Sequence, residues 1–413
     1  CVMSNLKQIM TLTFLFLSLC LSACTKPIQD VSIKTETSSA ISEPSIIKPS
    51  EENSMQGSDV SKNTTNEHIT QVLSSGVEVD ADILIPASMQ KSELPEMFGR
   101  GHVIDQNLVA SVFFEGEKSP EKQTEEFKDF SMFSKDSVYS TWTLEKERLT
   151  ISGTSANFSN GRNEVGYYLF SEFPTSLPFG DNRVTYLSGE NLEFSTIDEA
   201  KSQIQKYVNS LGISVLEPTC YTMDYDTMRA VYDGRTALET YDADFDFIIE
   251  PQKKDEQYIF DYPIAVNGMP LGNFEGGGYS DDSYMTGTFL RMTYGEEGIR
   301  AMTLPYALDV TEVGAMQPVL TLDEALQIVD DKYNSIIMEG NYKIDKIEMA
   351  YTPIQQQNVT EAKIIPVWRF QTNHTLQYSA KNDSNEIVEM TDTSYILINA
   401  LDGTELLHSN GDI

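Results

Sequence analysis

The densest group of residues that could bind a cation is "YDADFDFIIE", in which Asp242, Asp244 and Asp246 alternate with apolar residues. The series begins like the calcium loop of an EF-hand, whose ligands also start as D-x-D-x-D. The sixth position of such a loop requires glycine and here holds Phe247, and the twelfth requires glutamate and here holds Lys253. The pattern therefore predicts an amphipathic strand with its acidic face in water, and we expect no metal site.

Histidine, serine and glycine patterns give no further catalytic constellation. The chain has four widely separated histidines, His68, His102, His374 and His408, and it lacks HExxH, HxxxH and C-x-x-C, so zinc has no local support. "SGTSAN" around Ser155 lacks the second glycine of G-x-S-x-G. The glycine-rich "GNFEGGGYSDD" lacks the Lys-Ser/Thr of a phosphate-binding loop. We expect no catalytic residues, no cofactor and no metal, and hence no enzyme.

Two alternatives stay open at this point. Acidic residues are so abundant that a carboxylate pair for glycoside hydrolysis remains an alternative, because the separation it needs is a distance in space. Aromatic residues alternate at Tyr258, Phe260 and Tyr262, and again at Trp368 and Phe370. Their default interpretation is core packing, and the alternative is a groove that binds a solute, a peptide or a glycan.

The charge balance narrows the classes of partner. Lys and Arg total 29 against 63 Asp and Glu, which gives a formal net charge of −34. This excess argues against nucleic acid and against anionic lipid headgroups as partners. We expect a solvated acidic surface, with loose cation association or a basic partner as alternatives.

An apolar run over residues 9–21 follows Lys7 and ends in Leu-Ser-Ala-Cys at 21–24. The run has the length of a signal peptide and is short for a permanent transmembrane helix. Leu-Ser-Ala-Cys resembles the bacterial lipobox, which implies that the Cys24 thiol carries a diacylglycerol and becomes the mature N-terminus. An ordinary signal peptide cut elsewhere is the alternative, and Met3 is an alternative start residue. We expect a signal peptide over 1–23 and a protein anchored by lipid at Cys24 on the extracytoplasmic side of the cell membrane.

The stretch that follows, 24–75, is rich in Ser, Thr, Glu, Asn, Lys and Pro, so it predicts a disordered tether. If Cys24 is acylated, Cys220 has no partner for an intramolecular disulfide. Segments such as "VEVDADILIP", "LVASVFF", "SVYSTWTL" and "RLTISGTS" read as strands and predict a mostly-β module over 76–193.

One short phrase occurs twice, as "TIDEA" at 196–200 and "TLDEA" at 321–325. Each copy fits the S/T-x-x-E capping box that starts a helix: Thr196 with Glu199, and Thr321 with Glu324. Apolar residues follow at helical spacing, and Gly212 and Gly340 are expected to stop the two helices.

Strand-like segments follow each helix, and Asn267-Gly268 and Asp402-Gly403 are two-residue hairpin signals. These observations predict two α+β units, over 194–312 and 313–413. The expected fold class is therefore α+β: antiparallel sheets, each packed by a capped helix, in tandem repeat after an N-terminal mostly-β module.

The two units resemble the PepSY-type unit, in which a capped helix with D/E-E-A is followed by strands and a closing hairpin, here "YILINALDGTEL". "IIPVWRF" at 364–370 is also similar to a strand of YycH/YycI-like extracytoplasmic proteins of Gram-positive bacteria. Asn399 and Asp402 depart from the Asp and Thr that are typical of the hairpin. The resemblance covers 194–413 and implies a non-catalytic, membrane-tethered module that modulates a sensor kinase or a protease. We therefore expect a protein partner on the outer face, and no binding residues are carried over.

Overall fold

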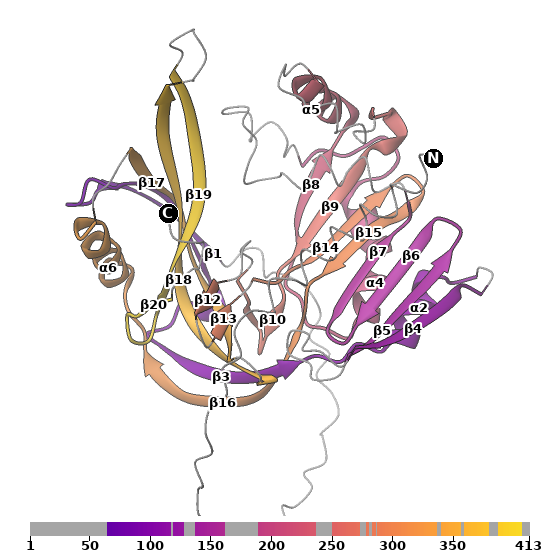
Figure 1. The fold of residues 1–413 in the computed structure, drawn as a ribbon, viewed down its shortest axis with the longest axis horizontal. Coiled ribbons are helices and arrows are strands. Elements are labelled where there is room, and N and C mark those ends of the chain that lie inside the picture. Colours follow the sequence, from indigo (N-terminus) through magenta and orange to yellow (C-terminus); the bar gives the residue numbers. More distant parts are fainter. Residues whose placement is uncertain are drawn as a thin grey trace, which may run out of the picture. The chain divides into compact units, whose positions relative to one another are not determined.

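The structure is a computed structural model of the chain. It describes residues 64–116, 119–127, 137–161, 189–236, 250–272, 278–280, 283–285, 287–336, 340–356, 359–379 and 387–406. These residues belong to one compact unit that begins at Ser58. They form two large sheets, a two-stranded ribbon and four α-helices, a mostly-β arrangement that is α+β in the broad sense expected (Figure 1).

Several predicted features lie outside the described residues. They include the signal peptide 1–23, Cys24, the tether as far as residue 63, and Asp242, Asp244 and Asp246. The far end of the tether is corrected, because Thr64–Val72 forms strand β1 and pairs with β2 along its whole length.

Sheet B, the eight-stranded sheet, is antiparallel throughout. Its strands in spatial order are β4 (Glu121–Phe127), β5 (Ser137–Leu144), β6 (Glu147–Ser152), β7 (Ser155–Ser159), β15 (Gly298–Leu304), β14 (Leu290–Gly295), β9 (Gln257–Tyr262) and β8 (Thr219–Met223). Helices α2 (Gln106–Phe113) and α4 (Ile197–Ser210) pack on one face, where the Phe113 ring lies 4.7 Å from Phe158 and 4.8 Å from Tyr207. Helix α5 (Tyr225–Thr236) follows β8.

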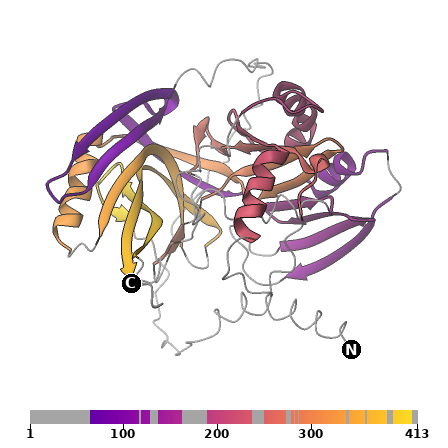
Figure 2. The same ribbon diagram turned by 90° about the horizontal axis from the view of Figure 1, so that it is seen from above.

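Sheet A has ten strands and curls into a half-barrel (Figures 1 and 2). Its main path is β1 (Thr64–Val72), β2 (Glu78–Pro86), β17 (Asn341–Gln356), β18 (Glu361–Ser379), β19 (Ile387–Asn399) and β20 (Glu405–Leu406). Beside this path lie β3 (Glu93–Gly101), β16 (Leu308–Pro318), β12 (Gly278–Ser280) and β13 (Ser283–Met285). The curl follows from β18, which pairs first with β3 and then with β19 on one side while β17 occupies the other. Helix α6 (Leu322–Asn334) packs against this sheet.

Both capped helices are confirmed. In α4 the Thr196 hydroxyl accepts from the Glu199 N–H, and the Glu199 carboxylate accepts from the Thr196 N–H at 2.9 Å. Helix α6 has the same reciprocal pair at Thr321 and Glu324. Each helix precedes four strands that form an antiparallel meander: β8-β9-β14-β15 after α4 and β17-β18-β19-β20 after α6. Gly212, at φ +69°, follows the end of α4 as expected, but α6 ends at Asn334, so Gly340 does not stop it.

The two hairpin predictions have different outcomes. Asn267 and Gly268, at φ +50° and +75°, form the tight turn between β10 (Ala265–Val266) and β11 (Met269–Pro270), as a type I′ turn requires. Strands β19 and β20 also form a hairpin, but its loop is longer than two residues. There only Gly403 has a positive φ, and Asp402 accepts a hydrogen bond from the Thr404 N–H at 2.9 Å.

One predicted strand, "LVASVFF", is a helix. Asp105 caps α2 by accepting hydrogen bonds at 3.1 Å from the N–H groups of Asn107 and Leu108. Val109, Ala110 and Phe113 then bury one helical face. The short 3₁₀ turns Ala87–Met89 and Lys253–Asp255 complete the regular elements.

Each sheet draws strands from more than one segment predicted from the sequence. Strands β2 and β3 of the 76–193 segment lie in sheet A, whereas β4–β7 lie in sheet B. Strand β16 runs without interruption across the predicted 312/313 boundary. One continuous cluster of buried side chains contains residues of both sheets. The boundaries at 76, 194 and 313 stay predictions about the sequence.

Candidate functional site

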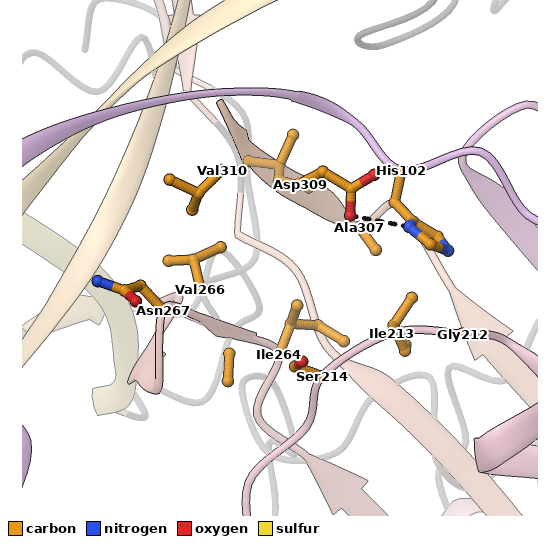
Figure 3. Close-up of a pocket in the computed structure, with 12 residues that line it drawn as sticks. His102, Gly212, Ile213, Ser214, Ile264, Val266, Asn267, Ala307, Asp309 and Val310 are labelled. Carbon is orange, nitrogen blue, oxygen red and sulfur yellow. Dashed lines mark hydrogen bonds and ion pairs between the residues drawn. The ribbon is translucent and has the colours of Figure 1, made fainter. Parts of the chain in front are cut away.

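A small cavity lies where four segments meet: the residue after β3, the residues after α4, the β10–β11 hairpin and the start of β16 (Figure 3). Its volume is about 170 Å³, below the roughly 300–1,000 Å³ of typical pockets for drug-sized ligands. Polar groups on its wall come from His102, Ser214, Asn267 and Asp309. The cavity has room for water molecules or one small polar group.

His102 is the titratable side chain of this cavity that is most withdrawn from water, and both of its ring nitrogens face acceptors. Nδ1 lies 2.9 Å from the Asp309 carboxylate, and Nε2 donates to the Leu211 carbonyl at 3.1 Å. Ser214 forms no hydrogen bond with His102 in the described part of the chain. The histidine joins the end of α4 to the start of β16.

A second histidine lies on the surface of sheet A. The His68 ring on β1 bonds Asp82 through Nδ1 and Asp80 through Nε2, both at 2.9 Å, and Asp80 also pairs with Lys343 at 2.6 Å. These hydrogen bonds, that of Asp82 first, raise the pKa of His68 above its ordinary value. Within the described ranges no group of three or more acidic, histidine or cysteine residues could hold a metal ion.

The alternating aromatic residues are core residues. Tyr258, Phe260 and Tyr262 on β9 and Trp368 and Phe370 on β18 are each at most 3% exposed. Two of them also form internal hydrogen bonds: Tyr258 donates to the Ser195 carbonyl at 2.6 Å, and the Trp368 indole donates to the Leu320 carbonyl at 2.9 Å. A groove lined by these rings is therefore excluded. Substitutions such as Phe260→Ala or Trp368→Ala would report on folding and not on binding.

A buried ion pair in sheet A is the strongest electrostatic feature that sequence reasoning missed. Glu348 on β17 lies opposite Arg369 on β18, and the two side chains form a hydrogen-bonded pair. Lys346 adds a contact at 2.9 Å to the same carboxylate. The pair joins neighbouring strands, so the arrangement holds β17 against β18.

Cys220 on β8 is partly buried and is a free thiol. Burial raises the pKa of this thiol to about 12, although the charge of Lys201 lowers it slightly. The thiolate that a nucleophile needs is therefore scarce at neutral pH.

No described helix has the length and apolar character that a membrane crossing requires. The predicted lipidation residue, Cys24, lies outside the described residues. The pairing of His102 with Asp309 had no local sequence signal, because 207 positions separate them.

No family model and no curated protein matches the chain. A crystal structure of an uncharacterized protein from Eubacterium rectale is similar, with a TM-score of 0.59 and 15% identity, over 82% of this chain and 93% of that one. This likeness shows a shared fold. The C-terminal domain of Bacillus megaterium YpeB aligns over 74% of this chain and 96% of that one at 12% identity, but its TM-score of 0.26 supports no argument.

Proposed function

We propose that this chain is a lipid-anchored extracytoplasmic protein whose folded unit binds another protein and catalyses no reaction. The observation that supports anchoring at the membrane is the lipobox-like Leu-Ser-Ala-Cys at 21–24, directly after the apolar run 9–21. Cys24 is the residue that would carry the lipid. The tether that follows would let the folded unit reach partners away from the membrane surface.

A protein partner is favoured over a small solute by what the described residues offer. The cavity beside His102 has only about 170 Å³, and the aromatic side chains that could line a groove are buried in the core. Protein partners, in contrast, bind to exposed surfaces and to the unpaired edges of sheets. Sheet A ends at β1 and sheet B at β4, and both strands are largely exposed.

The class of partner follows from the resemblance to PepSY-type and YycI-like units. Relatives of that kind modulate a sensor kinase or restrain a protease through protein contacts, so the proposed role is regulation of such a protein. The net charge of −34 supports a partner with a basic surface.

Crosslinking in native membranes, followed by purification of the full chain, tests this function. The expected result is one crosslinked protein whose yield saturates and which purified full chain competes away. A solute that binds tightly and raises the unfolding temperature, with no crosslinked protein, would instead establish the alternative of a solute-, peptide- or glycan-binding lipoprotein.

A further inference from the structure

Strand β4 is an open edge of sheet B. It pairs with β5 over seven residues, from Glu121 with Thr143 to Phe127 with Ser137, and with no other described strand. Residues 121–126 are all exposed. A strand at a sheet edge keeps half of its backbone N–H and C=O groups available for a further strand.

Three of the six side chains at residues 121–126 are acidic and one is basic. Glu121, Gln123 and Glu125 share one face of the strand, and Lys122, Thr124 and Glu126 share the other. The Lys122 ammonium lies 4.7 Å from the centre of the Trp142 ring on the neighbouring strand β5. Glu125 and Glu126 are both exposed.

These charges select among the strands that could pair with β4. A second copy of β4, paired antiparallel about Thr124, would gain two Lys122–Glu126 ion pairs but would leave Glu121 and Glu125 opposite uncharged residues. A strand with Lys or Arg opposite the glutamates gains cross-strand ion pairs and backbone hydrogen bonds together.

We propose that β4 is the docking edge for an extended, basic segment of the partner protein, which adds a ninth strand to the eight of sheet B. The partner class named here rests on the proposed function. The register follows from the positions of the charges. In an antiparallel addition the segment reads, from its N-terminus, basic opposite Glu126 and Glu125, neutral opposite Thr124 and Gln123, acidic opposite Lys122, and basic opposite Glu121.

The experiment uses the full chain in detergent and a labelled six-residue peptide with that charge order, followed by fluorescence anisotropy. A peptide of the same composition in scrambled order and one in reversed order are the controls. Saturable binding of the ordered peptide alone is expected, and it should weaken at least tenfold in the double variant Glu121→Lys/Glu125→Lys. A peptide that is acidic opposite positions 121 and 125 and otherwise unchanged should bind that variant better than the native chain.

Proline variants separate strand addition from simple charge attraction. Successive backbone N–H groups of β4 point alternately towards β5 and towards the open side of the sheet. Proline has no N–H, so one of the variants Gln123→Pro and Thr124→Pro removes a donor on the open side, and the other removes a hydrogen bond to β5. The variant that keeps the native denaturation midpoint should lose peptide binding although its charge is unchanged. Glu67→Lys, the same charge change on the exposed edge strand β1 of sheet A, should leave peptide binding unaltered.

The outcomes are distinct. Equal binding of ordered and scrambled peptides, or full binding by the stable proline variant, would overturn the inference. If the crosslinked partner of the membrane experiment binds the Glu121→Lys/Glu125→Lys variant as well as the native chain, the proposed function stands and β4 is not its site. If no protein crosslinks but the ordered peptide binds as described, the edge is a binding site and the proposed function fails.

Discussion

Glu348 and Arg369 show how strongly a single pair of residues is held in this sheet. Their side chains are 17% and 8% exposed, and they lie directly opposite each other on adjacent strands. Burial raises the pKa of the Glu348 carboxyl, but the charges of Arg369 and Lys346 outweigh burial and lower the pKa to about 2. The folded protein therefore stabilises the ionised carboxylate.

Replacing the arginine should be more harmful than replacing the glutamate. Arg369→Met leaves a buried carboxylate without its main partner, and removal of one member of such a pair costs on the order of 3–5 kcal/mol. Glu348→Gln leaves the Arg369 guanidinium without its counter-ion but keeps the shape and an oxygen that accepts its hydrogen bond, so its cost should be smaller. Urea denaturation at pH 7 measures both, and equal losses would contradict this account.

The same pair should make stability depend on pH in the acidic range. The pKa of Glu348 is lower in the folded state than the roughly 4.3 of an unfolded glutamate, so its contribution is complete above that value. The contribution is lost as the pH falls towards about 2, because protons then bind the unfolded state first. The stability difference between the native chain and Glu348→Gln should shrink over this range. A difference that stays constant down to pH 2.5 would show that the carboxylate is not stabilised by folding.

At the scale of elements, the capping boxes should stabilise helices α4 and α6 and so contribute to the free energy of unfolding. Thr321→Ala removes the acceptor for the Glu324 N–H and should cost about 1 kcal/mol. Thr321→Ser keeps the hydroxyl and serves as the matched control. Denaturant midpoints of the two variants compare them directly, and an equal loss in both would assign the effect to the lost methyl group.

Gly340, directly before β17, provides a second test at this scale. Its φ is +82°, and an added Cβ would lie 2.4 Å from the Thr375 carbonyl oxygen on β18. Gly268 has a similar φ of +75°, but nothing lies within 4 Å of its added Cβ. Gly268→Ala should therefore cost only backbone strain of about 1–2 kcal/mol, and Gly340→Ala should cost more. Equal costs by urea denaturation would mean that β18 moves away without penalty.

Sequence patterns over a few residues predicted the two capped helices and the hairpins, but they could not predict which strands pair when those strands lie far apart in the sequence. The capped helices and both hairpins depend on residues a few positions apart, so their sequences contain the information. "LVASVFF" was misread because a short apolar run fits strand and helix equally, and the cap at Asp105 lies just outside it. Helix α5 was missed, although Asp224 accepts from the Thr227 N–H at 2.7 Å as a helix cap does. No local pattern could show that β2 pairs with β17.

At the scale of the whole molecule, membrane attachment should depend on one side chain. Cys24→Ala should move the protein from the membrane fraction to the soluble fraction, because a lipid anchor supplies the attachment. Cys220→Ser is the matched control, since this partly buried thiol on β8 lies within the folded unit, and it should leave the protein at the membrane. Fractionation with immunoblotting measures both. Retention of Cys24→Ala at the membrane would refute the anchor.

The placement of β1–β3 in sheet A affects the order in which the chain can fold. These strands are synthesised first, yet their neighbours β16, β17 and β18 come near the end, with the strands of sheet B in between. The Tyr351 hydroxyl, for example, bonds the Pro95 carbonyl across 256 positions. A growing chain can complete sheet B while β2 and β3 still lack their partners β16, β17 and β18, and exposed strands in that state are prone to aggregate. Strands that are synthesised early therefore complete their pairing late, and the rate at which the rest of the chain is synthesised determines how long they stay exposed.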